Sequence, residues 1–206
     1  MVLQHIESFT GPSGQLEGIL HLPDETPKAI AVVAHPLPTM GGTMENKVVT
    51  TLARAFTELG FVALRFNFRG VGKSAGEFDR GNGEVEDMLA VVRHAREEFG
   101  HLPLTLSGFS FGGYVAARAA QHVHPQPHHL VLIAPAVGRF EMPPVPHNTL
   151  LIHGEQDEVV PLADVMDWAR PLHLPVVVLP GAEHFFHGRL HQIKQLVQQD
   201  FHGQQP

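Results

Sequence analysis

The sequence contains no cysteine. This absence excludes disulfide bonds, thiolate metal sites and a cysteine nucleophile, and it fits a reducing compartment. No apolar stretch reaches about 18 residues, the length that a membrane-spanning helix needs. No Lys or Arg precedes Lys28, and no early apolar run resembles the hydrophobic region of a signal peptide. We therefore expect a cytoplasmic protein that does not enter a membrane.

Basic residues are also scarce, with 14 Lys and Arg against 21 Asp and Glu and a formal net charge of −7. Nucleic-acid binding depends on clustered positive charge, so the composition favours a small-molecule partner over DNA or RNA. A chain of 206 residues is long enough for one domain with a substantial core and short for two. We expect a single domain over residues 1–206, as a monomer or a small homo-oligomer.

Apolar runs of strand length alternate with segments in which apolar residues recur at helical spacing. Some of these runs, such as AIAVVAHP at 29–36, are continuously apolar, as a strand buried on both faces should be. The expected strands cover 15–23, 29–36, 61–68, 102–107, 129–135, 149–154 and 175–181, and the expected helices cover 48–59, 85–99, 111–123, 162–172 and 190–201. This alternation predicts an α/β fold with a mainly parallel, doubly wound sheet of about seven or eight strands.

Ligands of such sheets bind at the carboxyl ends of the strands, and a serine in a tight glycine setting stands at one of these ends. Gly108-Phe109-Ser110-Phe111-Gly112 matches the pattern G-x-S-x-G between an expected strand and an expected helix. A sharp strand-to-helix turn strains the backbone of such a serine and lifts its hydroxyl above the sheet, and crowding favours glycine two residues to either side. Ser110 is therefore the candidate nucleophile.

A serine nucleophile needs a base, and the base needs an acid that orients it. Asp157 follows the apolar run at 149–154, and His184 follows the run at 175–181. Each of the three residues thus comes after a different expected strand, in the order Ser, Asp, His. Because these strand ends meet at one edge of the sheet, we expect the three side chains to lie together.

Other acids and histidines close to these positions are weaker candidates: Glu155, Glu158, Asp164, Asp167, His153 and His187. We expect the two glutamates to be solvated charges of the loop that holds Asp157. The two further aspartates fall in the following helix, too far along the chain. We expect His153 to belong to the core or to support the site, and His187 to begin the last helix.

At these positions the sequence resembles the α/β-hydrolase superfamily, and the resemblance covers nearly the whole chain. It is most similar to small bacterial hydrolases without a lid, related to dienelactone hydrolases and short-chain esterases. The stretches that carry the resemblance are AHPLPTMGGTMENKVV (34–49), LRFNFRGVGKSAGEFD (64–79), GFSFGG (108–113), LIHGEQDEVVP (151–161) and GAEHFF (181–186). It implies the α/β-hydrolase fold, with Ser110 as nucleophile, His184 as general base and Asp157 as its partner.

The resemblance also implies an oxyanion hole formed by the backbone N–H groups of Phe111 and Leu37, with no metal and no organic cofactor. Leu37 stands where relatives often carry a histidine, and dienelactone hydrolases proper use a cysteine nucleophile, which this chain lacks. Many members insert a cap between two late strands, but here only the short segment 136–148 separates the corresponding runs. We therefore expect no cap domain and an open, shallow site.

Two further motifs are expected to be structural. RGVGKSAG (69–76) is similar to a phosphate-binding P-loop, but Asn67 stands where the first glycine would be required. HVHPQPHH (122–129) is interrupted by proline and precedes a strand, so we expect an exposed loop and not a metal site. Two roles remain open for Arg69, which either binds a substrate carboxylate or forms an ion pair in its loop. Two also remain open for Phe185 and Phe186, which either line the pocket or pack against the last helix.

These residues predict a serine hydrolase, and specifically a carboxylic ester hydrolase for small acyl groups. A peptidase or a thioesterase uses the same machinery, and the residues do not separate these activities. The competing class is a hydrolase-fold protein that binds a ligand or a partner without catalysis.

Overall fold

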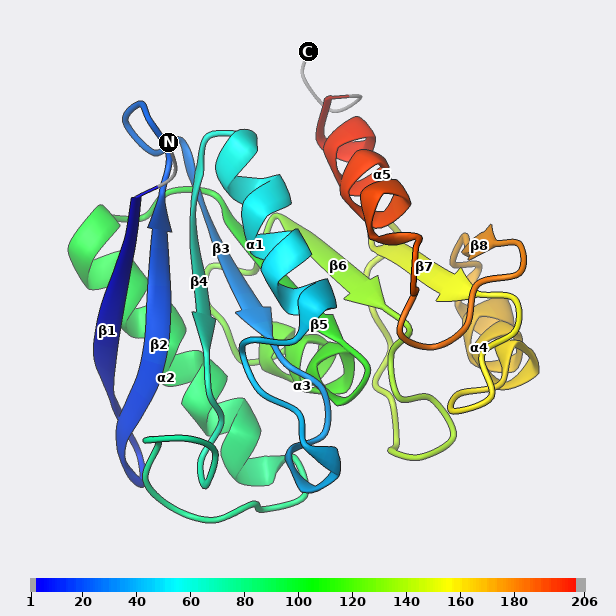
Figure 1. Ribbon diagram of the computed structural model, residues 1–206, viewed down its shortest axis with the longest axis horizontal. Helices are drawn as coiled ribbons and strands as arrows, with labels where there is room; N and C mark the ends of the chain where they lie inside the picture. The colour runs from blue at the N-terminus through cyan, green and yellow to red at the C-terminus, as the bar shows by residue number, and fades with distance from the viewer. Residues whose placement is uncertain (1–2, 203–206) are drawn as a thin grey trace.

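The computed structural model describes residues 3–202 of the chain. An eight-stranded sheet runs through these residues in the spatial order β1-β2-β4-β3-β5-β6-β7-β8, as Figure 1 shows. The strands are β1 (Leu3–Gly11), β2 (Gly14–Leu22), β3 (Ala29–Ala34), β4 (Phe61–Phe66), β5 (Leu104–Phe109), β6 (His129–Ile133), β7 (Leu150–Gly154) and β8 (Val177–Leu179).

The strand pairing follows from the sequence pattern. The strands from β3 to β7 are buried along their whole length, which matches their continuously apolar sequences. They pair in parallel with one another, and β8 continues the parallel sheet at one edge. By contrast, β2 pairs antiparallel with both β1 and β4, and its burial largely alternates as expected for a strand with one face exposed.

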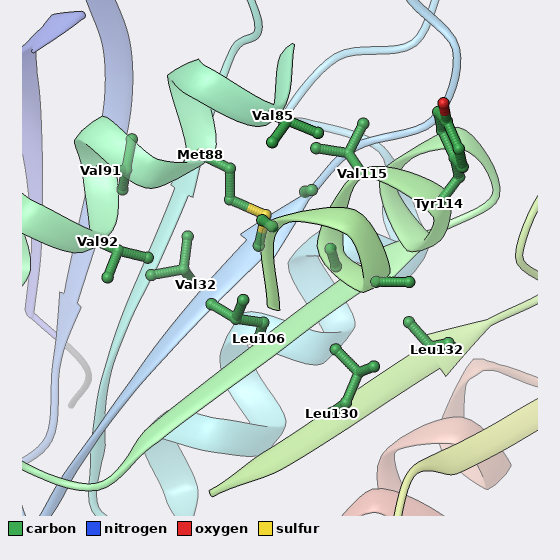
Figure 2. Close-up of a cluster of buried hydrophobic side chains, with 14 of the residues drawn as sticks. Val32, Val85, Met88, Val91, Val92, Leu106, Tyr114, Val115, Leu130 and Leu132 are labelled. Carbon is green, nitrogen blue, oxygen red and sulfur yellow. The ribbon is translucent and has the colours of Figure 1, made fainter. Parts of the chain in front are cut away.

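Helices cover both faces of the sheet. One face carries α1 (Lys47–Glu58) and α5 (Leu190–His202), whose apolar side chains join one core cluster. The other face carries α2 (Asn82–Phe99), α3 (Phe111–Ala120) and α4 (Leu162–Ala169), which belong to a second cluster. In Figure 2, side chains of α2 such as Met88 meet strand side chains such as Val32 and Leu106 in this second cluster. The sheet therefore separates two packed layers and holds the strand ends in fixed positions.

The predicted alternation of strands and helices is confirmed, and the differences lie at element ends. The strand expected over 29–36 ends at Ala34, and the strand expected over 61–68 ends at Phe66. The helix expected over 162–172 ends at Ala169 and continues as a 3-10 turn over Arg170–Leu172, because Pro171 lacks the N–H that an α-helix needs. The edge strand β1 was not predicted, since the segment carries no continuous apolar run.

The connection between β6 and β7 holds no inserted cap. Between β6 and β7, residues 134–149 form neither a helix nor a strand, apart from an isolated bridge between Val137 and Phe140. Within residues 3–202, every helix is either too short or too polar to cross a membrane.

Candidate active site

Ser110 occupies the sharp turn between β5 and α3. Its backbone lies at φ 54° and ψ −117°, a conformation that costs energy for any residue with a Cβ atom. The turn is held on both sides, because the Ser110 N–H donates to the Ile133 carbonyl at 2.9 Å and the Ser110 carbonyl accepts from the Gly113 N–H at 2.9 Å. The surrounding backbone thus maintains a strained serine at the carboxyl end of a central strand.

The two glycines of the motif are required by close backbone contacts. A Cβ atom at Gly108 would lie 2.2 Å from the carbonyl carbon of Gly112, and one at Gly112 would lie 2.3 Å from the carbonyl oxygen of Ala34. Real Cβ atoms do not approach other atoms so closely. Glycine therefore lets α3 begin directly against the end of β3, with Ser110 at the top of the turn.

The structure brings the predicted acid and histidine to this serine. His184 Nε2 lies 3.0 Å from Ser110 Oγ, and His184 Nδ1 lies 2.6 Å from Asp157 Oδ2. All three side chains are buried. In this arrangement Nδ1–H donates to the carboxylate, so Nε2 is free to accept the serine proton.

Asp157 and His184 meet because the loops after β7 and β8 lie in direct contact. A Cβ atom at Gly154 would lie 2.5 Å from the Ala182 carbonyl oxygen, so only glycine permits this approach. The Gln156 N–H then donates to the same carbonyl at 2.9 Å. This backbone contact fixes the distance between the two loops.

The carboxylate of Asp157 is held at both oxygens. Oδ1 accepts from the Val159 N–H at 2.9 Å and from the Val160 N–H at 2.7 Å, while Oδ2 faces His184. Burial opposes the charge, but the hydrogen bonds from His184 and Val160 outweigh it and lower the pKa of Asp157. Because the pKa of Asp157 is lower in the folded state than in the unfolded state, the ionised carboxylate stabilises the fold at any pH above the unfolded-state pKa. This stabilisation is lost as the pH falls through the folded-state pKa.

His153 supports this loop and does not reach the serine. It is fully buried at the end of β7, with Nε2 2.9 Å from the Val160 carbonyl oxygen and 3.4 Å from Asp157 Oδ2. Burial lowers its pKa, so the ring is neutral at neutral pH and can donate its Nε2–H toward the carbonyl. The role expected for His153, in the core or in support of the site, agrees with this position.

The other acids and His187 lie outside the cluster. Glu155 accepts from the Gly181 N–H at 2.8 Å, and Glu158 is exposed. Asp164 and Asp167 belong to α4, where Asp167 pairs with Arg170 at 2.6 Å. The prediction that His187 begins the last helix is wrong, because α5 begins at Leu190; His187 lies in the turn before it, with Nδ1 2.9 Å from Glu183.

The chain is similar to proteins whose structures share this arrangement of strands and helices. A serine hydrolase without a lid from Xanthomonas campestris matches 98% of this chain and 95% of its own, at 40% identity and a TM-score of 0.91. A family model described as serine aminopeptidase, S33, matches residues 25–147, more than half of the chain. The chain belongs to this α/β-hydrolase family.

Two further relatives extend the comparison. An uncharacterised protein of Rickettsia prowazekii is 33% identical over 192 residues, which cover 86% of this chain and 80% of that protein. A dienelactone hydrolase from Anabaena variabilis shares the fold at 19% identity, with a TM-score of 0.76 and 98% of each chain covered. The family model ends at residue 147, before Asp157 and His184.

His35 is a buried residue of this hydrolase to which the sequence analysis gave no role. Its Nε2 accepts from the Phe68 N–H at 3.0 Å, and its Nδ1 lies 2.7 Å from the Pro36 carbonyl oxygen, to which it donates. Burial lowers the pKa of His35 to about 4, against a smaller opposing effect of the bond to Pro36, so the ring is neutral. The only sequence signal was a histidine directly after a fully buried strand.

The bond from His35 sets the orientation of the peptide that contains the predicted oxyanion donor. The Pro36 carbonyl and the Leu37 N–H belong to one planar peptide unit and point in opposite directions. A hydrogen bond that holds the carbonyl toward His35 therefore directs the Leu37 N–H away from it. The second predicted donor, the Phe111 N–H, is the first of α3 and has no acceptor within its own helix.

Arg69 forms an ion pair, one of the two roles left open by the sequence. Its side chain is almost fully buried and binds Asp87 of α2, with Nε–Oδ2 and Nη2–Oδ1 distances of 3.0 and 2.8 Å. The Arg69 N–H also donates to Asp87 Oδ2 at 3.0 Å. With the guanidinium engaged by Asp87, binding of a substrate carboxylate is not supported.

The two phenylalanines after His184 differ. Phe186 is fully buried in the core cluster of α1 and α5. Phe185 is 43% exposed, and its ring lies 5.1 Å from that of His184 and 5.9 Å from that of Phe109, between ring centroids. Phe186 therefore packs against the helices, whereas Phe185 stands beside the site.

The two motifs set aside in the sequence occupy structural positions. The segment 69–76 is a loop in which Ser74 Oγ donates to the Asn67 carbonyl at 2.7 Å, and the next helix begins only at Asn82. Most of 122–129 is exposed, but His129 is buried at the start of β6 and pairs with Asp200 at 2.6 Å. Within residues 3–202, no group of three or more His, Asp or Glu side chains is arranged to hold a metal ion.

Proposed function

We propose that this hydrolase is a serine esterase for substrates with small acyl groups. The observation that supports this proposal most is the chain of contacts from Asp157 through His184 to a strained serine, with distances of 2.6 and 3.0 Å. A serine with an adjacent, oriented imidazole is the arrangement that activates a hydroxyl for attack on a carbonyl.

In the proposed reaction, Ser110 Oγ attacks the ester carbonyl carbon while His184 Nε2 takes its proton. The N–H groups of Leu37 and Phe111 bind the oxyanion of the tetrahedral intermediate. His184 then gives the proton to the leaving alkoxide, and the alcohol departs from an acyl-Ser110 ester. A water molecule then attacks the acyl-Ser110 ester while His184 takes its proton, and the carboxylic acid is released as Ser110 regains a proton from His184. Asp157 stabilises the imidazolium in both halves.

Active-site labelling tests the proposal directly. A fluorophosphonate probe is expected to modify Ser110 at a single site, located by mass spectrometry of the digested protein. A panel of p-nitrophenyl esters, a thioester and an aminoacyl p-nitroanilide then separates the three acyl-transfer activities. Absence of labelling at Ser110, or hydrolysis of the anilide faster than of every ester, would refute the esterase assignment.

The acyl-chain preference is expected to follow from the absence of a lid. Each methylene of a lengthening acyl chain contributes about 0.8 kcal/mol only when it is fully buried. The crossover between β6 and β7 holds no helix that could enclose such a chain. We expect kcat/KM for p-nitrophenyl esters to be highest from acetate to butyrate and to fall for longer chains. A maximum at esters of about ten carbons or more would contradict this, because it would require a deep apolar channel.

His35 is expected to act as a positioning residue for the oxyanion donor. His35→Leu should lower kcat for a short ester by about tenfold to 100-fold with a smaller change in KM, since removing one oxyanion donor outright costs about 10²- to 10³-fold. His35→Gln keeps an amide donor and an acceptor in place, so it should recover part of the loss. Thermal melting of both variants provides the control for folding. If kcat per folded molecule is unchanged in His35→Leu, the positioning role is wrong.

A further inference from the structure

A small cavity is lined in part by Phe185, the residue that directly follows His184. It is formed between the start of α1 and the segment that leads into α5, and its volume is about 160 Å³. Its lining includes the apolar residues Phe185, Val48 and Leu190 and the polar residues Lys47 and His187. The chain reaches α1 from the carboxyl end of β3 and reaches α5 from the carboxyl end of β8. Both strand ends lie at the edge of the sheet that carries Ser110 (Figure 1).

The position of the cavity relates it to the leaving group. In acyl transfer the histidine gives its proton to the departing oxygen, so the leaving group must face His184. Phe185 follows His184 directly, and the two rings are 5.1 Å apart in an edge-to-face contact. Phe185 thus connects the histidine that the leaving group must face with the cavity that Phe185 lines.

The size and the surface of the cavity suit one ring. An apolar cavity of about 150 Å³ in another protein binds benzene. Large apolar side chains are usually buried, yet Phe185 is 43% exposed while its ring is held against His184 and Phe109. Its exposed face is available for an offset or edge-to-face contact with an aromatic substrate group.

The charge of the lining indicates an anionic substituent. Lys47 is exposed, and among residues 3–202 no carboxylate forms an ion pair with it. Two acids lie close in the sequence to the lining residues. Glu45 pairs with Arg65 at 2.9 Å. The carboxylate of Glu183 accepts hydrogen bonds from the Phe185 N–H at 3.0 Å and the His187 N–H at 2.7 Å, and it lies 2.9 Å from His187 Nδ1. The ammonium of Lys47 therefore provides a counter-charge for an anion bound in the cavity.

We propose that this cavity is a leaving-group subsite for alcohols that carry one aromatic ring and a carboxylate. The proposal rests on the esterase function above. In the reaction, the bond between the acyl carbon and the alkoxide oxygen breaks, and the proton that His184 took from Ser110 passes to that oxygen. The carboxylated aryl alcohol leaves past Phe185 and Lys47, and water then releases the acid from Ser110.

Three acetates that differ little at the reacting oxygen test the proposal: benzyl acetate, 4-carboxybenzyl acetate and 4-(aminomethyl)benzyl acetate. The methylene between ring and oxygen keeps the alcohols similar as leaving groups. We expect kcat/KM to be highest for the carboxylated ester and lowest for the aminomethyl ester. At an ionic strength of about 1 M, where the Debye length is about 3 Å, this preference should largely disappear.

Matched variants assign the preference to Lys47. Lys47→Met should lower the ratio of kcat/KM for the carboxylated ester to that for the aminomethyl ester by about threefold to fivefold, as expected for one exposed ion pair. Lys47→Glu should reverse the preference. Lys28→Met is the control, because this substitution removes the same net charge at a distant place. Lys28 is an exposed lysine that precedes β3, at the other end of the sheet. It should leave the ratio unchanged.

A second variant tests the ring contact. Phe185→Ala should lower kcat/KM for benzyl acetate relative to ethyl acetate by about threefold to tenfold, the range of a lost aromatic contact. The subsite is overturned if Lys47→Met and Lys28→Met change the charge preference equally, or if Phe185→Ala affects the benzyl and ethyl esters to the same extent. These results differ from a failure of the esterase function, in which the unmodified protein hydrolyses no ester and Ser110 is not labelled.

Discussion

Replacing Ser110 with alanine is expected to reduce kcat for p-nitrophenyl acetate by about 10³-fold or more, leaving only the catalysis that binding and oxyanion stabilisation provide. The substitution removes the oxygen that lies 3.0 Å from His184 Nε2. It leaves the backbone conformation as strained as before, because alanine also carries a Cβ atom. The loss of activity should therefore occur without a large change in stability.

The measurement is kcat from initial rates, with thermal melting as the test of folding. Ser13→Ala is the matched control, since Ser13 is exposed in the turn between β1 and β2 and far along the chain from the site. It should retain full activity and full fluorophosphonate labelling at Ser110. Retention of about a tenth of the activity by Ser110→Ala would exceed the residual rate that a lost nucleophile allows and would contradict its assignment.

The alternation of strands and helices and the position of the serine could be predicted because both follow from local patterns. Continuous apolar runs such as residues 29–34 occur where a strand is buried on both faces. The glycines around Ser110 are required by contacts of 2.2 and 2.3 Å that any Cβ atom would make, so the motif itself reports a crowded turn. Asp157 and His184 could be named as candidates because each follows a strand of the parallel sheet.

The supporting residues could not be predicted, because their roles depend on contacts between distant segments. His35 accepts a hydrogen bond from the N–H of Phe68, 33 residues along the chain. Arg69 could not be assigned to Asp87 from the sequence, since their separation of 18 positions leaves the direction of α2 open. Phe185 and Phe186 are identical in type and adjacent, and only the positive φ of 53° at Phe186 and the packing around it separate the buried ring from the exposed one.

Replacing Asp157 with asparagine is expected to lower kcat by about 10⁴-fold while the fold remains intact. The reason lies in the fixed orientation of the carboxylate. Oδ1 accepts from the Val159 and Val160 N–H groups, so the amide oxygen of asparagine would occupy this position. The amide nitrogen would then face His184 Nδ1, where it can only donate. His184 would become protonated at Nε2 and could no longer accept the proton of Ser110.

The measurement is kcat and KM for p-nitrophenyl acetate, together with fluorophosphonate labelling, which should slow in parallel because it needs the same activated serine. Glu158→Gln is the matched control, since Glu158 is the exposed neighbour of Asp157 and undergoes the same change from acid to amide. We expect Glu158→Gln to retain nearly full activity. An equal loss in the two variants would mean that the loop after β7 provides its acid from Glu158. Full activity of Asp157→Asn would show that the 2.6 Å contact between Asp157 and His184 does not set the histidine tautomer.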